Sequence, residues 1–321
     1  MVLKRLIVKN FGSIEDMQID IAPITILFGQ PNSGKTTVLF APIFFCEVAK
    51  SVLNPYKFQN IQNIPIYFNG KVIFYYDKDK KAEIQLMFSN EHKESVYGMI
   101  LEKGNLKIWR DGEGSQIIIS IPFNIKKPDF KYDYGYFRLL ESLKIVRDEH
   151  AYIIPSLIPE KVSIRLEKIT GKIVKDIYPA FQVIDKFSYT YTLNNEGAGF
   201  VQIIYLLSNI LGDGIHSVFI EQPENRLHPK TQYKLVQEFI DIVKTEGKTL
   251  IIETNSEIIV SSFLSFVAEK RLSPQDIKCW HFRLEGDKNV ITERAVNEKG
   301  RMEKHFFNFI EVENIKKMLG I

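Results

Sequence analysis

An eight-residue segment, GQPNSGKT at residues 29–36, constrains this chain more than any other part of its sequence. It matches the pattern GxxxxGK[ST], with Gly29, Gly34, Lys35 and Thr36 at the defined positions. Glycines at this spacing let successive backbone N–H groups curl around phosphate oxygens, and the dipole of a following helix adds to the attraction. The apolar run ITILF comes directly before the segment, and apolar residues at helical spacing follow it. The pattern therefore predicts a strand, a phosphate-binding loop (P-loop) and a helix.

Two side chains of the loop would act directly on a nucleoside triphosphate. Lys35 would neutralise the β- and γ-phosphates, and the Thr36 hydroxyl would bind the accompanying Mg²⁺. ATP and Mg²⁺ are therefore the expected cofactors. The residues expected to bind the nucleotide are Gly29, Asn32, Ser33, Gly34, Lys35, Thr36 and Thr37. A glycine turn that only caps a helix is the alternative, and the strand before the loop and the helix after it disfavour that alternative.

A second strand that carries a carboxylate is needed to complete the magnesium site of such a loop. The segment SVFIE at residues 217–221 supplies one, because four mostly apolar residues lead to Glu221. Thr36 and Glu221 are therefore the predicted metal-binding residues.

Strands and helices alternate in the last third of the chain, which predicts parallel βα units and an α/β fold. The stretch 64–122 instead holds short β-like segments separated by turn residues, so an antiparallel β-subdomain is expected there. Residues 135–150 and 159–182 have amphipathic helical periodicity and suggest a helical arm or lid. The other expected strands are 3–9, 17–28, 217–221, 249–253, 277–284 and 289–295, and the other expected helices are 36–50, 199–211, 229–245 and 256–270.

The composition is that of a globular protein without a strong overall charge. The 321 residues carry 42 Lys and Arg against 39 Asp and Glu, so any nucleic-acid surface must be local. Only Cys46 and Cys279 occur, which is typical of a reducing compartment. The longest apolar run, Val38 to Cys46, is interrupted by Pro42 and is half as long as a bilayer span requires. These features predict a cytoplasmic protein with no membrane segment.

Several segments resemble the ATP-binding heads of the ABC type, in particular the AAA ATPases related to the OLD and SMC/RecF-like proteins of bacteria and archaea. SVFIEQPENRLHP at 217–229 is similar to the hhIEEPExxLHP consensus of that group, and NEGAGFVQIIYLL at 195–207 is similar to its version of the ABC signature. LIVKNFGSIEDMQIDIAPITILFGQPNSGKTT resembles the opening of these proteins, and ETNSE at 253–257 resembles their final strand, ETHSE. The resemblance covers about residues 1–50 and 190–321.

This resemblance implies an α/β P-loop NTPase of the ABC-head type, with a mixed sheet and an inserted β-rich and helical arm region. It implies an N-terminal lobe with the P-loop at 1–50 and an inserted β-subdomain and helical arm at 51–185. A C-terminal lobe with the signature, the acidic strand and the switch strand would occupy 186–321.

The resemblance also implies how such an ATPase would work. Two heads would pair head to tail, and each ATP would lie between the P-loop of one protomer and Gly197, Gly199 and Gln202 of the other. Binding of ATP would then close a clamp. The alternative is a loop with two glycines that only precedes a core helix, and the position of the pair about twenty residues before the acidic strand disfavours it.

Three positions depart from the family pattern, and all three bear on hydrolysis. Gln222 stands where the family has a carboxylate that orients or deprotonates the attacking water, and an amide cannot accept that proton. Asn255 replaces the switch histidine; it can hydrogen-bond to a γ-phosphate oxygen but cannot carry a positive charge. Val201 stands where the signature has a serine or threonine. The residues at the catalytic positions are therefore Glu221, Gln222 and Asn255, and slow hydrolysis is expected.

Three explanations of Gln222 stay open. The first is a natural ATP-binding switch with weak turnover. The second is a glutamine introduced in place of glutamate to trap the ATP-bound state, which comparison with the gene would decide. The third is that Glu224 or Glu253 provides the base, although both are out of register with that position.

The family context gives three functional hypotheses, because related proteins act in DNA repair and in bacterial defence against phage, often with a nuclease or toxin partner. The first is an ATP-gated switch or scaffold for a separate effector, and the three departures favour it. The second is a DNA-stimulated ATPase motor in DNA repair. The third is a transporter ATPase subunit, disfavoured by the roughly 160 residues between P-loop and signature. The expected partners are a second or further copy of the chain, an effector or nuclease protein, and DNA, with no membrane.

Further candidate residues have plainer interpretations. The segment 126–138 interleaves cations with aromatic rings, which suits nucleic-acid strands, but a solvated crossover is the favoured interpretation. Gln59 and Gln62 are candidates for a metal contact by position alone. His228 is expected to cap the next helix at least as readily as to contact nucleotide.

Overall fold

A computed structural model describes most of the chain and divides it into two compact units. The described residues are 2–53, 80–89, 94–102, 105–111, 116–122, 143–146, 158–177, 180–286, 288–302 and 319–320. Unit 1 comprises Met1–Ala22, Leu27–Leu143 and Trp280–Glu293, and unit 2 comprises Pro23–Ile26, Lys144–Cys279 and Arg294–Ile321. The three-part division at residues 50 and 185 stays a prediction.

The described strands and helices follow the order expected in the first and last parts of the chain. The strands are β1 Val2–Phe11, β2 Ile14–Asp20, β3 Ile24–Gly29, β4 Ala82–Ser89, β5 Glu94–Glu102, β6 Asn105–Asp111, β7 Gln116–Pro122, β8 Leu143–Val146, β9 Ile173–Ile177, β10 Ala180–Ile184, β11 Thr190–Thr192, β12 Ser217–Glu221, β13 Thr249–Thr254, β14 Ile277–Glu285 and β15 Lys288–Arg294. The helices are α1 Lys35–Leu53, α3 Glu160–Thr170, α4 Ala198–Ile210, α5 Pro229–Glu246 and α6 Glu257–Ala268, with 3₁₀ turns at Leu193–Asn195 and Pro274–Asp276.

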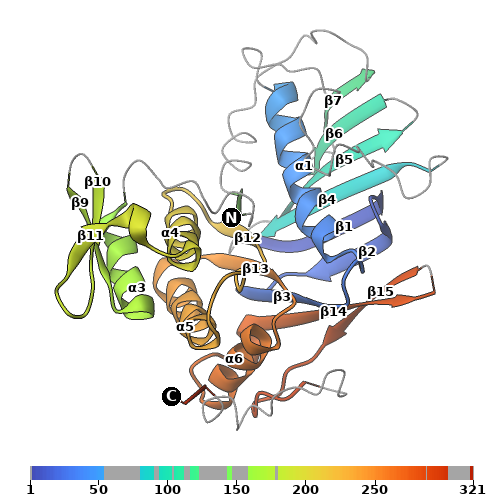
Figure 1. The fold of residues 1–321 in the computed structure, drawn as a ribbon. Coiled ribbons are helices and arrows are strands. Elements are labelled where there is room, and N and C mark those ends of the chain that lie inside the picture. Colours follow the sequence, from blue (N-terminus) through green and yellow to red (C-terminus); the bar gives the residue numbers. More distant parts are fainter. Residues whose placement is uncertain are drawn as a thin grey trace. The chain divides into compact units, whose positions relative to one another are not determined.

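Unit 1 contains an antiparallel sheet with the strand order β2-β1-β4-β5-β6-β7 (Figure 1). Side chains alternate along β1, where Leu6 and Val8 are buried and Lys9 is exposed. Gly98 of β5 lies opposite Trp109 of β6, and a Cβ atom at Gly98 would come within 2.1 Å of the indole ring. The sheet confirms the antiparallel β-structure predicted for the described residues between 82 and 122, whereas the predicted segment 65–76 lies outside the described residues.

Helix α1 packs against β1 and β4 of this sheet. The rings of Phe11 and Phe44 meet with their centroids 5.4 Å apart. The helix predicted for 36–50 is confirmed, and it continues through Pro42 to Leu53. This packing fixes the helix that follows the P-loop.

A second six-stranded sheet has the order β15-β14-β3-β13-β12-β8. Every residue of β3 and of β13 is buried, which explains the apolar runs ITILF in β3 and LII in β13. Strand β12 pairs in parallel with β13, in a register that runs from Ser217 opposite Thr249 to Glu221 opposite Glu253. With α5 between these strands in the chain, the pair is the parallel βα unit that the sequence predicted.

Three expected elements differ from the structure. The helix predicted for 159–182 is wrong beyond Thr170, because Gly171 adopts a left-handed φ of 74° and ends α3, its N–H donating to Glu167 O. Antiparallel strands β9 and β10 follow instead. The strand predicted for 17–28 is two strands, since the chain leaves β2 at Asp20 and Pro23 offers no N–H for a ladder. Of the helix predicted for 135–150, residues 143–146 form β8 and the rest lies outside the described residues.

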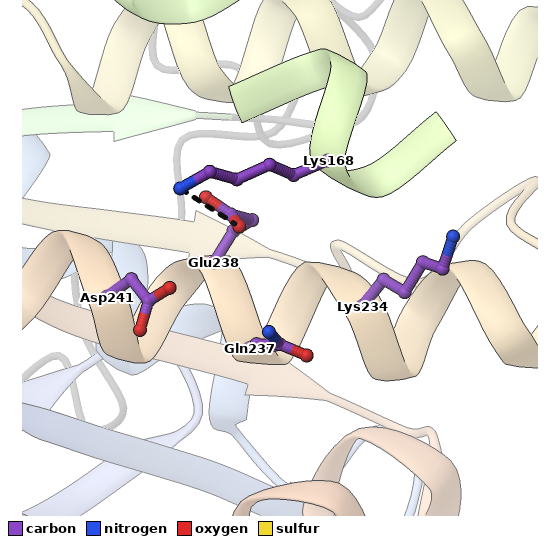
Figure 2. Close-up of a pocket in the computed structure, with 5 residues that line it drawn as sticks. All are labelled: Lys168, Lys234, Gln237, Glu238 and Asp241. Carbon is purple, nitrogen blue, oxygen red and sulfur yellow. Dashed lines mark ion pairs between the residues drawn. The ribbon is translucent and has the colours of Figure 1, made fainter. Parts of the chain in front are cut away.

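An ion-pair network joins α3 to α5 within unit 2. Arg165, which is 9% exposed, donates to Glu238 Oε2 at 3.2 Å, to Thr245 Oγ1 at 2.9 Å and to Glu246 Oε1 at 3.3 Å. Figure 2 shows Lys168 of α3 with its ammonium group directed at the Glu238 carboxylate, 4.0 Å away. A pocket of about 360 Å³ beside this pair is lined by Lys168, Lys234, Gln237, Glu238 and Asp241. Glu238, which lines this pocket, is held by Lys168 and by Arg165, so the pocket lies beside a structural junction of α3 and α5.

In the part of the chain that the structure describes, none of the helices combines the length and the apolar character that crossing a membrane requires.

Candidate functional site

The P-loop in unit 1 depends on three residues with positive φ. Gly29, Asn32 and Gly34 have φ values of 132°, 60° and 93°. A Cβ atom at Gly29 would lie 1.9 Å from Phe282 O, and one at Gly34 would lie 2.7 Å from Ile14 Cδ1. Only glycine satisfies both the backbone conformation and the space at positions 29 and 34, whereas asparagine tolerates the left-handed conformation at 32.

Lys35 is buried inside this loop with only 3% of its surface exposed. Its Nζ donates to Gly29 O at 3.0 Å and to Gln30 O at 2.7 Å, and Ser33 Oγ donates to the same Gln30 O at 2.6 Å. No acidic residue lies in the first turn of α1. The loop therefore holds a positive charge at the N-terminal end of a helix, which suits the phosphates of a nucleotide.

The hairpin of β14 and β15 forms hydrogen bonds with the P-loop and with Ser13, and no sequence motif predicts these bonds. Gln30 N donates to Phe282 O at 3.0 Å, and Leu284 N donates to Gln30 Oε1 at 2.9 Å. Asn289 Nδ2 donates to Ser13 O at 2.5 Å, while its buried Oδ1 has no hydrogen-bond partner in the described part of the chain. These residues lie more than 250 positions from the loop in sequence, so no local motif could have revealed them.

The acidic strand end in unit 2 places Glu221 beside Glu253 of the neighbouring strand. The chain then turns at Gln222, which has a φ of 42° and donates its N–H to Glu253 O at 2.9 Å. Gln222 Oε1 accepts from Asn225 Nδ2 at 3.1 Å. The carboxamide at the predicted catalytic position is therefore held within its own loop.

Glu224 connects this loop to the predicted switch residue. Its Oε1 accepts from Asn255 N at 2.9 Å, and its buried Oε2 has no partner among the residues that the structure describes. Burial raises the pKa of Glu224, although hydrogen bonds from the backbone of residues 224, 255 and 256 and from Thr254 oppose the rise. The sequence indicates Glu224 only as an alternative base, whereas its contact with Asn255 is visible only in the structure.

Replacing Glu224 with glutamine should stabilise the protein at neutral pH. Because the folded-state pKa of Glu224 lies above its ordinary value of 4.5, the wild type loses stability as pH rises through the interval between the two values. Glutamine keeps the Oε1 acceptor and has no charge to bury. We expect a melting temperature about 2–4 °C higher near neutral pH, corresponding to about 1 kcal/mol, and no difference below the ordinary pKa.

Thermal unfolding across a pH series measures this effect, with Glu160→Gln, at an exposed position, as the matched control. Equal stability of the Glu224→Gln variant and the wild type at every pH would contradict the prediction. The same variant tests Glu224 as the base, since unchanged ATP turnover would exclude that role.

The predicted signature begins α4 in unit 2. Gly197 is the N-cap residue, is exposed and provides no side-chain cap. A Cβ atom at Gly199 would lie 2.5 Å from Arg226 O, so glycine is needed for α4 to approach the loop after β12. Gln202 is 2% exposed, and its buried Oε1 has no partner in the described residues. Of the three predicted signature residues, only the two glycines are accessible.

The remaining candidates are placed as follows. His228 is the N-cap of α5, and its Nδ1 accepts from Lys230 N at 3.3 Å, which confirms the capping interpretation. The described residues contain no group of three or more His, Cys, Asp and Glu side chains that would hold a metal ion by themselves. Gln59, Gln62 and the segment 126–138 lie outside the described residues. Unit 1 carries the P-loop, and unit 2 carries Glu221, Gln222, Asn255 and the signature glycines.

Comparison with known families decides what kind of protein carries these loops. The family model described as AAA ATPase domain matches residues 1–184, which is more than half of the chain. The chain belongs to the AAA ATPase domain family. The match includes the whole P-loop and ends before the acidic strand. The signature, acidic and switch segments of this AAA ATPase lie outside the match, so their assignment depends only on the residues of those segments.

Similar proteins agree with this family. The protein named ATP/GTP phosphatase from Helicobacter pylori (strain ATCC 700392 / 26695) is 21% identical in an alignment that covers 84% of this chain and 89% of its own length. The SMC head domain from Thermotoga maritima is similar in structure, with a TM-score of 0.58, 13% identity and coverage of 91% of this chain and 98% of its own. The Smc head domain with an extended coiled coil bound to the C-terminal domain of ScpA, from Pyrococcus furiosus, has a TM-score of 0.62, 10% identity and coverage of 99% and 98%.

The family match confirms the predicted relationship to AAA ATPases, and the solved SMC heads confirm the predicted α/β P-loop fold. The comparisons also confirm the enzyme class, an ATPase. The family implies that this AAA ATPase binds nucleotide. The individual site residues and the cytoplasmic location stay predictions.

Proposed function

We propose that this AAA ATPase is an ATP-gated dimerising head that hydrolyses ATP slowly and acts as a switch or scaffold for a separate effector protein. The observation that carries this proposal is the presence of glutamine at position 222, where the family has a carboxylate. An amide at the position of the general base cannot take a proton from water, and its oxygen already accepts from Asn225. Nucleotide binding is then kept while turnover is slow, as a switch requires.

The P-loop residues fit the triphosphate of ATP. The buried Lys35 supplies positive charge, Gly29 and Gly34 keep the backbone close, and α1 begins without an acidic residue that would repel phosphate. Asn32, Ser33 and Thr37 complete the loop, and Thr37 Oγ1 is held 3.0 Å from Ser13 Oγ. In this proposal ATP is bound by residues 29–37.

Thr36 and Glu221 are our proposal for the Mg²⁺ ion that accompanies ATP. A hydroxyl and a carboxylate oxygen are ligands that Mg²⁺ accepts, and this ion normally completes its shell with phosphate oxygens and water. When bound, the ion would neutralise charge on the phosphates.

The signature glycines support pairing of two heads. Because Gly197 is exposed and α4 has no side-chain cap, the first N–H groups of this helix remain available to an anion. We propose that they meet the γ-phosphate held by a second copy of the chain. Asn255, which is exposed and fixed through its N–H by Glu224, would hydrogen-bond to phosphate within its own protomer.

An effector partner fits the same scheme. The Smc head from Pyrococcus furiosus is described as bound to a domain of ScpA, a separate protein. A head of similar fold in this chain would act on a separate protein in the same manner, and a setting in phage defence or DNA metabolism follows from the resemblance of the signature and acidic segments.

Mg-ATP should convert the purified protein from monomer to dimer. Analytical ultracentrifugation with and without Mg-ATP measures the mass, and phosphate release with and without DNA measures turnover. We expect an ATP-dependent dimer and slow turnover that DNA does not change. A monomer indifferent to ATP would refute the clamp, and turnover stimulated by DNA would favour the motor hypothesis.

A further inference from the structure

The side chains of Lys172, Tyr191 and Glu196 converge directly before the predicted signature glycine Gly197. Glu196 is nearly buried, with 7% of its side chain exposed. Its Oε1 accepts from Lys172 Nζ at 2.6 Å and from the Tyr191 hydroxyl at 2.6 Å. One carboxylate oxygen is thus held by a cation and a phenol that come from different segments of unit 2.

The same cluster contacts the first turn of α4. Lys172 Nζ lies 5.4 Å from the ring centroid of Phe200 and 5.7 Å from that of Tyr191. Phe200 is 8% exposed and sits three residues after Gly197. Lys172 therefore touches the residue before the predicted signature and a residue within it, which fixes the direction in which Glu196 points.

The protonation of the two donors supports a permanent cluster. Burial lowers the pKa of Lys172, but hydrogen bonds with Glu196 and Tyr191 outweigh burial and leave the pKa raised. The hydrogen bond to Glu196 raises the pKa of Tyr191. Both groups keep their protons at neutral pH and continue to donate to the carboxylate.

The position of Glu196 creates an electrostatic conflict that the cluster resolves. A carboxylate next to the N-terminus of a helix attracts the exposed N–H groups and repels other anions. Glu196 precedes the N-cap Gly197, and no side chain caps α4. If Glu196 were released, it would compete for the N–H groups that a phosphate needs.

We propose that Lys172 and Tyr191 are positioning residues of the signature, which neutralise Glu196 and hold it away from the N-terminus of α4. This leaves the helix end available to the phosphate of a nucleotide on a second copy of the chain. The inference rests on the proposed function, because it concerns the dimer that ATP induces.

The test measures dimerisation by sedimentation in Mg-ATP and, separately, ATP affinity of the dilute monomer. Lys172→Met should weaken dimerisation at least about tenfold, since a buried carboxylate loses its cation, and should leave monomer ATP affinity unchanged. Tyr191→Phe keeps the cation and should weaken dimerisation only about two- to threefold. Lys175→Met, an exposed lysine three residues away, is the control for loss of one positive charge.

Rescue separates this role from a merely structural one. The double variant Lys172→Met/Glu196→Gln should dimerise within about threefold of the wild type, and Glu196→Gln alone should dimerise as well as the wild type or better, because the competing charge is gone. A structural brace would instead be weakened by Glu196→Gln. Melting curves of each variant show whether it is folded.

The outcomes distinguish the two proposals. If the wild type dimerises with Mg-ATP and Lys172→Met does so equally well, or if Glu196→Gln weakens the dimer, the role of the cluster is refuted and the proposed function stands. If the wild type remains monomeric in Mg-ATP, both are refuted. Should Lys172→Met fail to fold, Tyr191→Phe and Glu196→Gln decide the question.

Discussion

Turnover of ATP should rise by about 10²- to 10⁴-fold when Gln222 is replaced with glutamate, which is the scale of effect expected for a general base. A carboxylate at this position can accept the proton of the attacking water, whereas the amide cannot. The change alters few atoms, and the Gln222 backbone is fixed by its N–H bond to Glu253 O. Asn225 Nδ2, which now donates to Gln222 Oε1, can donate to the carboxylate in the same way.

Steady-state phosphate release in excess ATP measures this change, and a single-turnover experiment shows whether the chemical step itself is faster. Gln237→Glu, on α5, introduces the same chemical change outside the predicted catalytic positions and serves as the control. Turnover of tens per second by the protein with Gln222 would refute the slow switch, and an unchanged rate in the variant would indicate that another group acts as base.

Replacing Lys35 with methionine should reduce turnover by about 10²- to 10³-fold, because the loss of a preorganised charge at a transferring phosphate costs this much in comparable sites. ATP affinity should fall at least about tenfold through loss of a charge-assisted hydrogen bond. Lys35 is 3% exposed, so the charge that is lost lies inside the loop and not on the protein surface. Methionine has a similar length and leaves the apolar stem packed.

Titration with a fluorescent ATP analogue and measurement of phosphate release test this prediction. Lys9→Met, an exposed lysine of β1 in the same unit, is the matched control for charge. Because Lys35 Nζ also binds two loop carbonyls, a melting curve is needed to show that the variant is folded. Full ATP affinity in a folded Lys35→Met variant would overturn the assignment of residues 29–37 as the triphosphate site.

Local patterns in the chain were sufficient to predict the elements whose period and end signals agree. The apolar run before Gly29, the helix from Lys35 and the alternation of β12, α5 and β13 are present as predicted. Their side chains repeat with the period of a strand or helix, and glycine or capping residues mark their ends. The prediction was wrong where amphipathic periodicity continued past a helix stop, as at Gly171.

Contacts between distant segments were decided only by the tertiary structure. Asn289 bonds to Ser13, and Gln30 to the backbone of β14, because strand pairing brings residues more than 250 positions apart into hydrogen-bond range. In the same way, Glu224 meets Asn255 only because β12 and β13 are neighbours, and Lys172 meets Glu196 only because α3 ends beside α4. Motif and periodicity are short-range properties of the chain, so they predict the loops and elements. The partners of each buried polar group depend on how those elements pack.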